Sequence, residues 1–318
     1  MKKPEYTIIY VTNRSDCLFD WFLDSVLKDM GKDASVTQLV LVDIYCGTAE
    51  RSTWMKDYST QLKKFHSFKH TIPKPNVWAG GYKLTSVDYF APSAFRNTGL
   101  LWTEADHVTF IDDVSVVCPG WWDYTKQSKK AQEIYLGTYD KHWHMNVVKG
   151  ILKGSDCRES GLDTRRTHLK EHHKEPFYCH GTWMYGCSLS APLEAFLQIN
   201  GYDEDCDSMG SEDYVAGIML EAHGWKFKFC MGMKTIESEE YHRMETPAKR
   251  IIKKVPAPDA SHAILNMVRD GGRTTGAFYC SLGMNLRECR EHVLKTKEMP
   301  ITKIPEHDWR DGQPLSEM

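Results

Sequence analysis

Apolar residues in the first part of the chain follow two kinds of pattern. Tyr6–Thr12 and Gln38–Tyr45 are short runs rich in β-branched and aromatic residues, which is the profile of buried strands. Between them, apolar residues recur at helical spacing from Leu18 to Met30, and Gly31 follows as a stop signal. A strand, a helix and a strand with short connections predict a right-handed crossover and a parallel sheet.

The alternation continues towards the middle of the chain. Ser52–Phe68 has helical character, and Ala91–Glu104 is a second predicted helix that leads directly into an apolar strand at Val108–Ile111. Lys74–Tyr89 is rich in Pro, Gly and aromatic residues without a clear period, so we expect a loop there. This order of units describes a Rossmann-like nucleotide-binding half.

Further strands and helices follow in the second half of the chain, around one long polar segment. Helices are predicted at Trp121–Lys130, Pro192–Ile199 and Ser211–His223, and strands at Glu133–Thr138, Phe177–Ser190 and Trp225–Met231. Residues 139–176 are rich in His, Lys, Arg and Gly, and we interpret them as a functional loop that is mobile until a ligand orders it. The part beyond Pro256 is helix-rich and ends in a polar tail.

These elements predict an α/β protein with a Rossmann-like mixed sheet flanked by helices. We expect one domain over residues 1–260, with a nucleotide-binding half at about 1–125 and a second half at about 126–260. Residues 261–318 are expected to form a helix-rich C-terminal extension packed on that domain.

Composition narrows the classes of partner and compartment. The 318 residues carry 40 basic and 43 acidic side chains, a net charge of -3, which gives no global reason to expect nucleic acid or an anionic membrane. The ten cysteines are scattered without a CxxC pair, so neither a zinc module nor a disulfide scaffold is indicated. No apolar run has the length of a membrane span, and the first residues do not resemble a signal peptide. We therefore expect a soluble, cytoplasmic protein.

Two adjacent carboxylates, Asp112 and Asp113, end the strand that begins at Val108. Such neighbours repel each other unless a cation or hydrogen-bond donors compensate their charge. Mg²⁺ and Mn²⁺ take carboxylate oxygens and are commonly completed by substrate phosphates. Ligands of open α/β sheets also bind beyond the carboxyl ends of the strands. Taken alone, however, the pair is more typical of a solvated acidic turn.

Three stretches together resemble the nucleotide-sugar glycosyltransferases of the GT-A fold. One stretch resembles the donor half of that family, and it reads RNTGLLWTEADHVTFIDD. The acceptor half of the family is resembled by CHGTWMYGCSLSAPLEAFLQINGYDED followed by GSEDYVAGIMLEAHGW, especially as found in β-1,4-galactosyltransferases, polypeptide N-acetylgalactosaminyltransferases and the inverting bacterial and viral transferases. The resemblance covers roughly residues 6–245 and implies that 1–260 is a GT-A catalytic domain. The implied reaction moves a sugar from a nucleoside-diphosphate sugar, expected to be a UDP-sugar, to an acceptor hydroxyl with inversion.

The resemblance also implies a metal site for Mn²⁺ or Mg²⁺. The family usually has Asp-x-Asp at the strand end, whereas this chain has Ile111-Asp112-Asp113-Val114. Asp113 is the implied metal ligand, with Asp112 on the metal or on the donor ribose. His242 lies where related enzymes place a further metal ligand, and an ordinary surface histidine is an equal alternative.

Further residues are implied to bind the donor. The set is Thr12, Arg14, Asp43, Arg96, Asn97 and Asp112. Thr12 and Arg14 would line the base pocket, and Asp43 would contact the nucleobase or ribose, although it fits a turn-capping carboxylate equally well. The guanidinium of Arg96 suits a diphosphate or a structural carboxylate.

A second acidic pair, Glu212-Asp213, opens the predicted helix that follows Ser211. Inverting transfer needs a general base beside the acceptor hydroxyl, with an oxocarbenium-like transition state. The resemblance implies that Asp213 is this base and that Glu212 holds the acceptor. The pair alone would be explained by the helix dipole, which favours acids in a first turn.

Three alternatives remain beside an inverting transferase. They are a retaining glycosyltransferase, a catalytically silent nucleotide- or sugar-binding module, and a nucleotidyltransferase. The last would need a glycine-rich phosphate loop after the first strand, where VTNRSDC offers only Arg14. The acceptor stays open among a glycan, a lipid-linked glycan, a protein, a small molecule and a modified nucleic-acid base.

Overall fold

The computed structural model describes residues 2–74, 91–168, 176–207, 210–243, 258–280 and 282–300. Its strands are β1 (Tyr6–Thr12), β2 (Thr37–Asp43), β3 (Ser67–Thr71), β4 (His107–Asp112), β5 (Ser115–Val117), β6 (Ile134–Val148), β7 (Ile151–Cys157), β8 (Phe177–Cys179), β9 (Ser188–Pro192) and β10 (Phe227–Ser238). Its α-helices are α1 (Phe19–Met30), α2 (Ala49–Asp57), α3 (Ser59–Leu62), α4 (Pro92–Trp102), α5 (Trp121–Ala131), α6 (Leu193–Gln198), α7 (Glu212–Ala222), α8 (Glu239–Arg243), α9 (Pro258–Arg269) and α10 (Leu286–Thr296).

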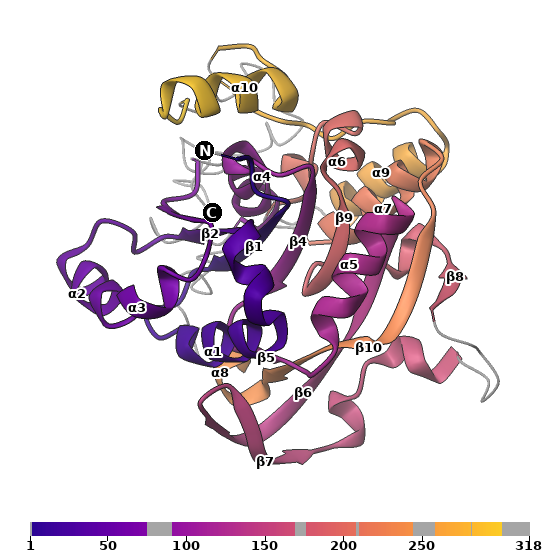
Figure 1. Cartoon of the computed structure of the whole chain (residues 1–318). Coiled ribbons are helices and arrows are strands. Elements are labelled where there is room, and N and C mark those ends of the chain that lie inside the picture. Colours follow the sequence, from indigo (N-terminus) through magenta and orange to yellow (C-terminus); the bar gives the residue numbers. More distant parts are fainter. Residues whose placement is uncertain are drawn as a thin grey trace, which may run out of the picture.

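These strands form one mixed sheet in the order β3-β2-β1-β4-β9-β6-β10-β5, with β7 added to β6 and β8 to β10 (Figure 1). The four strands β3, β2, β1 and β4 are mutually parallel, which confirms the predicted crossover between β1 and β2. Strand β9 then runs antiparallel between β4 and β6. The expected α/β class with a mixed sheet between helices is confirmed. The carboxyl ends of β1, β2 and β4 share one edge of the sheet.

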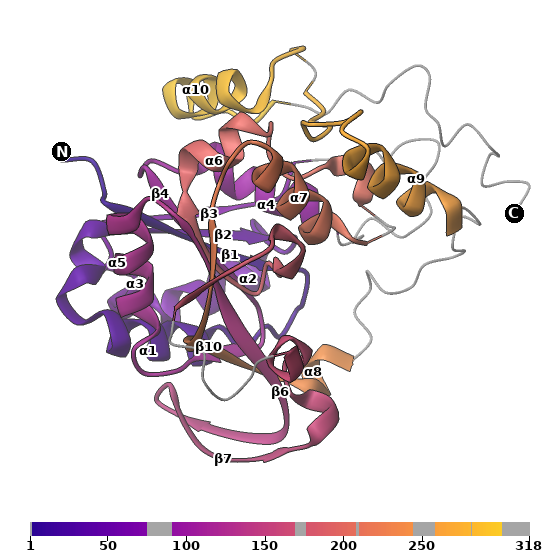
Figure 2. The same ribbon diagram turned by 90° about the vertical axis from the view of Figure 1, so that its right-hand side faces the viewer.

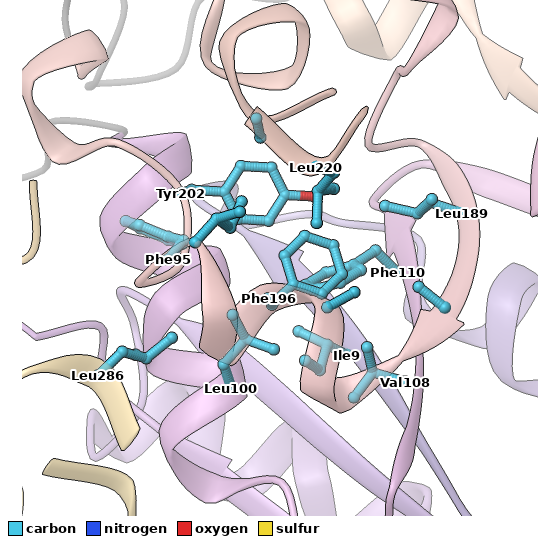
Figure 3. Close-up of a cluster of buried hydrophobic side chains, with 14 of the residues drawn as sticks. Ile9, Phe95, Leu100, Val108, Phe110, Leu189, Phe196, Tyr202, Leu220 and Leu286 are labelled. Atoms are coloured by element: carbon cyan, nitrogen blue, oxygen red, sulfur yellow. The ribbon is translucent and has the colours of Figure 1, made fainter. Parts of the chain in front are cut away.

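Helices cover both faces of the sheet, and each face has its own apolar core (Figure 2). One core lies under α4, α6, α7 and α10, and the other under α1 and α5. In the first core, the rings of Phe196 and Tyr202 stack with centroids 5.2 Å apart, and Phe110 meets both rings edge-on (Figure 3). This aromatic cluster fixes α6 and the following turn against β4, the strand that ends in the acidic pair.

Two sequence-based predictions fail because strands were hidden by polar composition. The helix expected over Ser52–Phe68 ends earlier, at Leu62, and Ser67–Thr71 is the partly exposed edge strand β3. The irregular loop expected over 139–176 is wrong for 139–157, where β6 continues to Val148 and pairs with β7. Alternate residues at the end of β6 are exposed, so this strand carries polar residues without being a loop. Residues 169–175, and most of the loop expected at Lys74–Tyr89, lie outside the described residues.

The helices after residue 257 pack on the rest of the molecule. Leu286, Cys289 and Val293 of α10 belong to the core that includes α4, and the Arg290 guanidinium donates to the Thr103 carbonyl at 2.8 Å. A boundary near residue 260 stays a prediction. Within the described ranges, no helix has both the length and the apolar character needed to span a membrane.

A buried ion pair of Lys74, after β3, with Glu204, after α6, holds the backbone of Tyr279 in this extension. The Lys74 ammonium lies 2.6 Å from the Glu204 carboxylate, with side chains 1% and 0% exposed, and also donates to the Tyr279 carbonyl. Breaking a buried pair leaves an uncompensated charge, so Lys74→Met should lower the free energy of unfolding by about 3–5 kcal/mol. Arg287→Met, in the exposed pair with Glu194, should cost less than about 1 kcal/mol. Urea unfolding of both variants tests this, and equal losses would contradict it.

Candidate active site

The shared edge of β1, β2 and β4 gathers polar side chains from three strands. In the strand register, Thr12 lies opposite Asp43, and Val11 lies opposite Asp112. Side chains alternate along β4, so Phe110 enters one core and Ile111 the other. Asp112 and Asp113 consequently meet different partners.

Asp113 is held by two residues from the end of β1. The Thr12 hydroxyl donates to its carboxylate at 2.7 Å, and the Arg14 Nε donates at 3.2 Å. Arg14 also donates to the Tyr241 carbonyl on α8 at 2.6 Å. Burial raises the pKa of Asp113 to about 6, and the positive charge of Arg14 limits the rise. Thr12 and Arg14 therefore contact Asp113 directly, and the expectation that they line the base pocket stays a prediction.

Arg96 joins the two acidic pairs. From α4, its Nη1 lies 3.0 Å from a Glu212 oxygen and 3.1 Å from an Asp213 oxygen, and its Nη2 lies 3.3 Å from Asp112. The guanidinium side chain is only 4% exposed. A single buried cation shared among three carboxylates brings the end of β4 and the start of α7 to one place. This arrangement assigns Arg96 a structural role between carboxylates in this structure.

Asp213 is further fixed by a backbone amide. Gly186 N–H donates to its second oxygen at 2.8 Å. Burial raises the pKa of Asp213 to about 7, Arg96 works against the rise, and the charges of Glu212 and Asp112 add to it. A carboxyl group whose pKa lies near neutral pH is well suited to act as a general base at that pH.

Gly186 is a part of the site that the sequence analysis missed. A Cβ at this position would lie 2.3 Å from the Nη2 of Arg96, so only glycine leaves the guanidinium its place. An isolated glycine within a strand-like stretch, here Phe177–Ser190, is itself a signal of close approach by a neighbouring group. The sequence therefore indicated a close approach at Gly186 but did not identify Arg96 as the neighbouring group.

Glu237 at the end of β10 is a second missed residue. It pairs in register with Ser115, next to the first acidic pair, and its charge acts on both Asp112 and Asp113. His242 Nδ1 lies 2.7 Å from its carboxylate. Burial alone would raise the pKa of Glu237, but the His242 hydrogen bond and the nearby Lys141 lower it. The structure thus places His242 on Glu237 at the margin of the site.

Asp43 and Asn97 are engaged elsewhere. The buried Asp43 carboxylate is paired with Arg51 at 2.7 Å and with His70 at 3.0 Å. Arg51 in turn stacks over the Trp54 ring at 4.3 Å and lines a small pocket beside this pair. The Asn97 amide bonds only to Tyr202 and Glu204 in the interactions of the described residues, so it supports the buried ion pair beneath the site.

The backbone is strained beside both acidic pairs. Val114 follows Asp113 with φ of 52°, and Ser211 precedes Glu212 with φ of 70°. Left-handed backbone is rare for residues other than glycine, and it is costly for a β-branched side chain. Ser211 precedes α7 as predicted, but its side chain makes no capping hydrogen bond. Strain of this kind is concentrated at functional sites, where surrounding contacts hold it in place.

The carboxylates suit a divalent cation only in part. Among the described residues, no three His, Cys, Asp or Glu side chains converge as a preformed metal cage. Mg²⁺ and Mn²⁺ sites on diphosphates, however, need only one or two carboxylates, because the phosphates supply other ligands. Asp112 is 33% exposed, and Asp113 is 11% exposed with Thr12 and Arg14 on it. These two carboxylates therefore fit a cation whose remaining ligands come from a diphosphate, and Asp112 is the more accessible of the two.

Similarity to known proteins is visible in the structure alone. No family model matches the chain, and no curated protein matches its sequence. Among solved structures, S. aureus TarS is 12% identical with a TM-score of 0.52, over 91% of this chain and 42% of that chain. TarS 1-349 in complex with UDP-GlcNAc is 12% identical with a TM-score of 0.53, over 83% of this chain and 65% of that chain. GalNAc-T7 with UDP, GalNAc and Mn²⁺ is 13% identical with a TM-score of 0.55, over 86% of this chain and 56% of that chain.

TarS and GalNAc-T7 are GT-A glycosyltransferases, and the likeness shows that the present chain has the GT-A fold. The chain spans roughly half of the length of the solved structures it resembles. At this level of identity the likeness establishes architecture only.

Proposed function

We propose that this protein is a glycosyltransferase that moves a sugar from a nucleoside-diphosphate sugar, most simply a UDP-sugar, to an acceptor hydroxyl by a single inverting displacement. The observation that carries the proposal is the clamp of Arg96 on both acidic pairs at the carboxyl edge of a GT-A sheet. Neighbours of the same fold were crystallised with UDP, and in one case with UDP-GlcNAc.

In this proposal the two pairs divide the work. Asp213 accepts the proton of the attacking acceptor hydroxyl, and Glu212 holds that hydroxyl in line with the donor. Arg96 favours the ionised form of Asp213 and fixes it relative to Asp112, because it touches both carboxylates. Thr12 and Arg14 hold Asp113 on the donor side. Asp112 and Asp113 would hold Mn²⁺ or Mg²⁺, which when bound would neutralise charge on the departing diphosphate.

The nucleoside would lie next to the buried Asp43. Tyr45, Arg51 and Trp54 line the pocket there, and two of these side chains are aromatic. Flat aromatic and guanidinium groups stack well on a nucleobase. Asp43 itself would act through Arg51, which it orients.

A screen of nucleotide sugars tests the proposal directly. Each donor is incubated with the protein, with Mn²⁺, Mg²⁺ or EDTA, and the released nucleotide is measured by a luminescent readout. Cleavage of one donor above the level of an Asp213→Asn control would support the proposal and identify donor and cation together. Binding of UDP without release from any donor, even with added acceptors, would instead indicate a silent binding module.

Gly186→Ala is expected to reduce kcat on the order of 100-fold, since displacements near 1 Å in a catalytic constellation have effects of that size. The new methyl group would displace the Arg96 guanidinium from the carboxylates that it contacts. Gly154→Ala is the matched control, because a Cβ there meets no atom within 4 Å. Steady-state kinetics with the donor found in the screen provide the measurement. Equal rates for both alanine variants would rule out Gly186 as a positioning residue.

A further inference from the structure

A second pocket lies away from the acidic pairs, between α1, β5 and the tip of the β6–β7 ribbon. Its volume is about 380 Å³, which is in the range of small-molecule sites. Figure 1 shows α1 and β5 side by side above the ribbon. The ribbon tip is seated closely, because a Cβ on Gly150 would lie 2.2 Å from the Ser25 amide nitrogen. No residue named in the candidate active site lines this pocket.

Most of the lining is apolar. The six aliphatic or proline side chains come from three separate segments, and they are Val116, Val117, Pro119, Ile151, Leu152 and Ile236. Water in such a pocket has few hydrogen-bond partners, so its displacement by an apolar ligand favours binding of that ligand. The lining therefore favours an alkyl chain or a ring without polar substituents.

Lys28 and Asp29 are the charged residues of the lining, and they differ in what their side chains contact. The Asp29 carboxylate accepts hydrogen bonds from the backbone amides of Gly120 and Trp122 at 2.7 and 2.6 Å, at the N-terminus of α5. Lys28 is exposed and has no ion pair among the described residues. Two more exposed lysines, Lys149 and Lys153, flank the apolar ribbon tip. Lys28, Lys149 and Lys153 thus bring three ammonium groups near the mouth of the pocket, beside the Asp29 carboxylate that the amides of α5 hold.

From the apolar lining and the exposed lysines we propose that the pocket binds an anionic amphiphile that has one alkyl chain and is free in solution. Its alkyl chain enters between Val117 and Leu152, and its carboxylate or phosphate meets Lys28. The site is independent of the proposed transferase activity. It does share a strand with the active site, because Ile236 lines the pocket while the next residue, Glu237, carries His242.

Cys118 allows occupancy to be measured at the site itself. This thiol lines the pocket, whereas the exposed Cys157 at the other end of β7 does not. The full chain is treated with N-ethylmaleimide, with and without decanoate below its micellar concentration, and labelling at each cysteine is followed by peptide mass spectrometry. We expect decanoate to slow labelling of Cys118 at least fivefold and to leave Cys157 unchanged. Unchanged labelling of Cys118 would overturn the proposal.

Charge selectivity is tested with a ligand and a variant. Decyltrimethylammonium has the same chain with the opposite charge and should protect Cys118 far less than decanoate does. Lys28→Gln should raise the decanoate concentration needed for half protection about tenfold, which corresponds to about 1.4 kcal/mol. Lys64→Gln, at an exposed position outside the lining, should leave it unchanged. Equal protection by both detergents would refute the assignment of an anionic ligand.

Discussion

Asp213→Asn is expected to lower kcat about 10²–10⁴-fold and to leave the affinity for the donor nucleotide nearly unchanged. Asparagine keeps the shape of the side chain and its contact with the Gly186 amide, but it cannot accept a proton. In the proposed mechanism the donor is held by the other acidic pair, so its binding should not depend on this oxygen. Steady-state kinetics and calorimetry with UDP measure the two quantities separately.

The pH dependence of the wild-type enzyme gives a second signature of the same group. Burial raises the pKa of Asp213 to about 7, and a general base works only when it is ionised. Activity should therefore be present above pH 7 and be lost as the pH falls through that value. The residual rate of Asp213→Asn should not show this loss of activity at low pH. If the variant lost activity over the same pH range, another group would be responsible for the loss.

Glu212→Gln distinguishes binding of the acceptor from chemistry. Glu212 contacts Arg96 at 3.0 Å and is expected to hold the acceptor hydroxyl, so its substitution should raise the acceptor KM more than it lowers kcat. The product anomer, read by NMR, must be inverted in a single displacement. A retained anomer, or normal turnover by Asp213→Asn, would exclude the mechanism and leave Asp213 as a carboxylate at a helix N-terminus.

Apart from the partly exposed edge strand β3, the parallel half of the fold follows from local sequence patterns. Tyr6–Thr12 is β1 without any change of bounds, and the helix predicted to end at Met30 does so. Fully buried strands are continuous apolar runs, and their ends are therefore visible in the sequence. The polar half of β6 has no such run, because its register with β7 leaves alternate residues in solvent. Pattern alone cannot separate such a ribbon from a loop.

The acidic pairs were visible in the sequence, whereas their connections were not. Arg96 is more than 100 positions away from Glu212, and no local pattern indicates that they touch. Glu237 stands among other acids in ESEE, and only the pairing of β10 with β5 distinguishes it from them. Likewise, Asn97 and Arg96 are neighbours in the chain, but the helix turns Asn97 towards Glu204. Residue type was informative here, and long-range packing decided the role.

The second large effect is expected at the donor side, where Asp112→Asn should remove the gain in UDP affinity that Mn²⁺ provides. We expect this gain to be about 10–100-fold in the wild-type protein, the size typical when one group of a metal site is lost. Asp112 is 33% exposed and faces Arg96, whereas the oxygens of Asp113 receive the Thr12 hydroxyl and Arg14. Calorimetry with UDP in Mn²⁺ and in EDTA measures the gain, and affinities in EDTA should be alike in both proteins.

Two matched variants make the assignment of Asp112 specific. Asp113→Asn retains an oxygen for the Thr12 hydroxyl, so it should reduce the Mn²⁺ gain only partly. Thr12→Val removes that hydroxyl and leaves both carboxylates in place, and it should have a smaller effect than either acidic substitution. The opposite order, with the gain lost in Asp113→Asn and kept in Asp112→Asn, would make Asp113 the ligand and Asp112 the partner of Arg96 alone. No gain from Mn²⁺ in the wild-type protein would mean that Arg14 and Arg96 carry the diphosphate charge without a metal, because they are the cations bound to this pair.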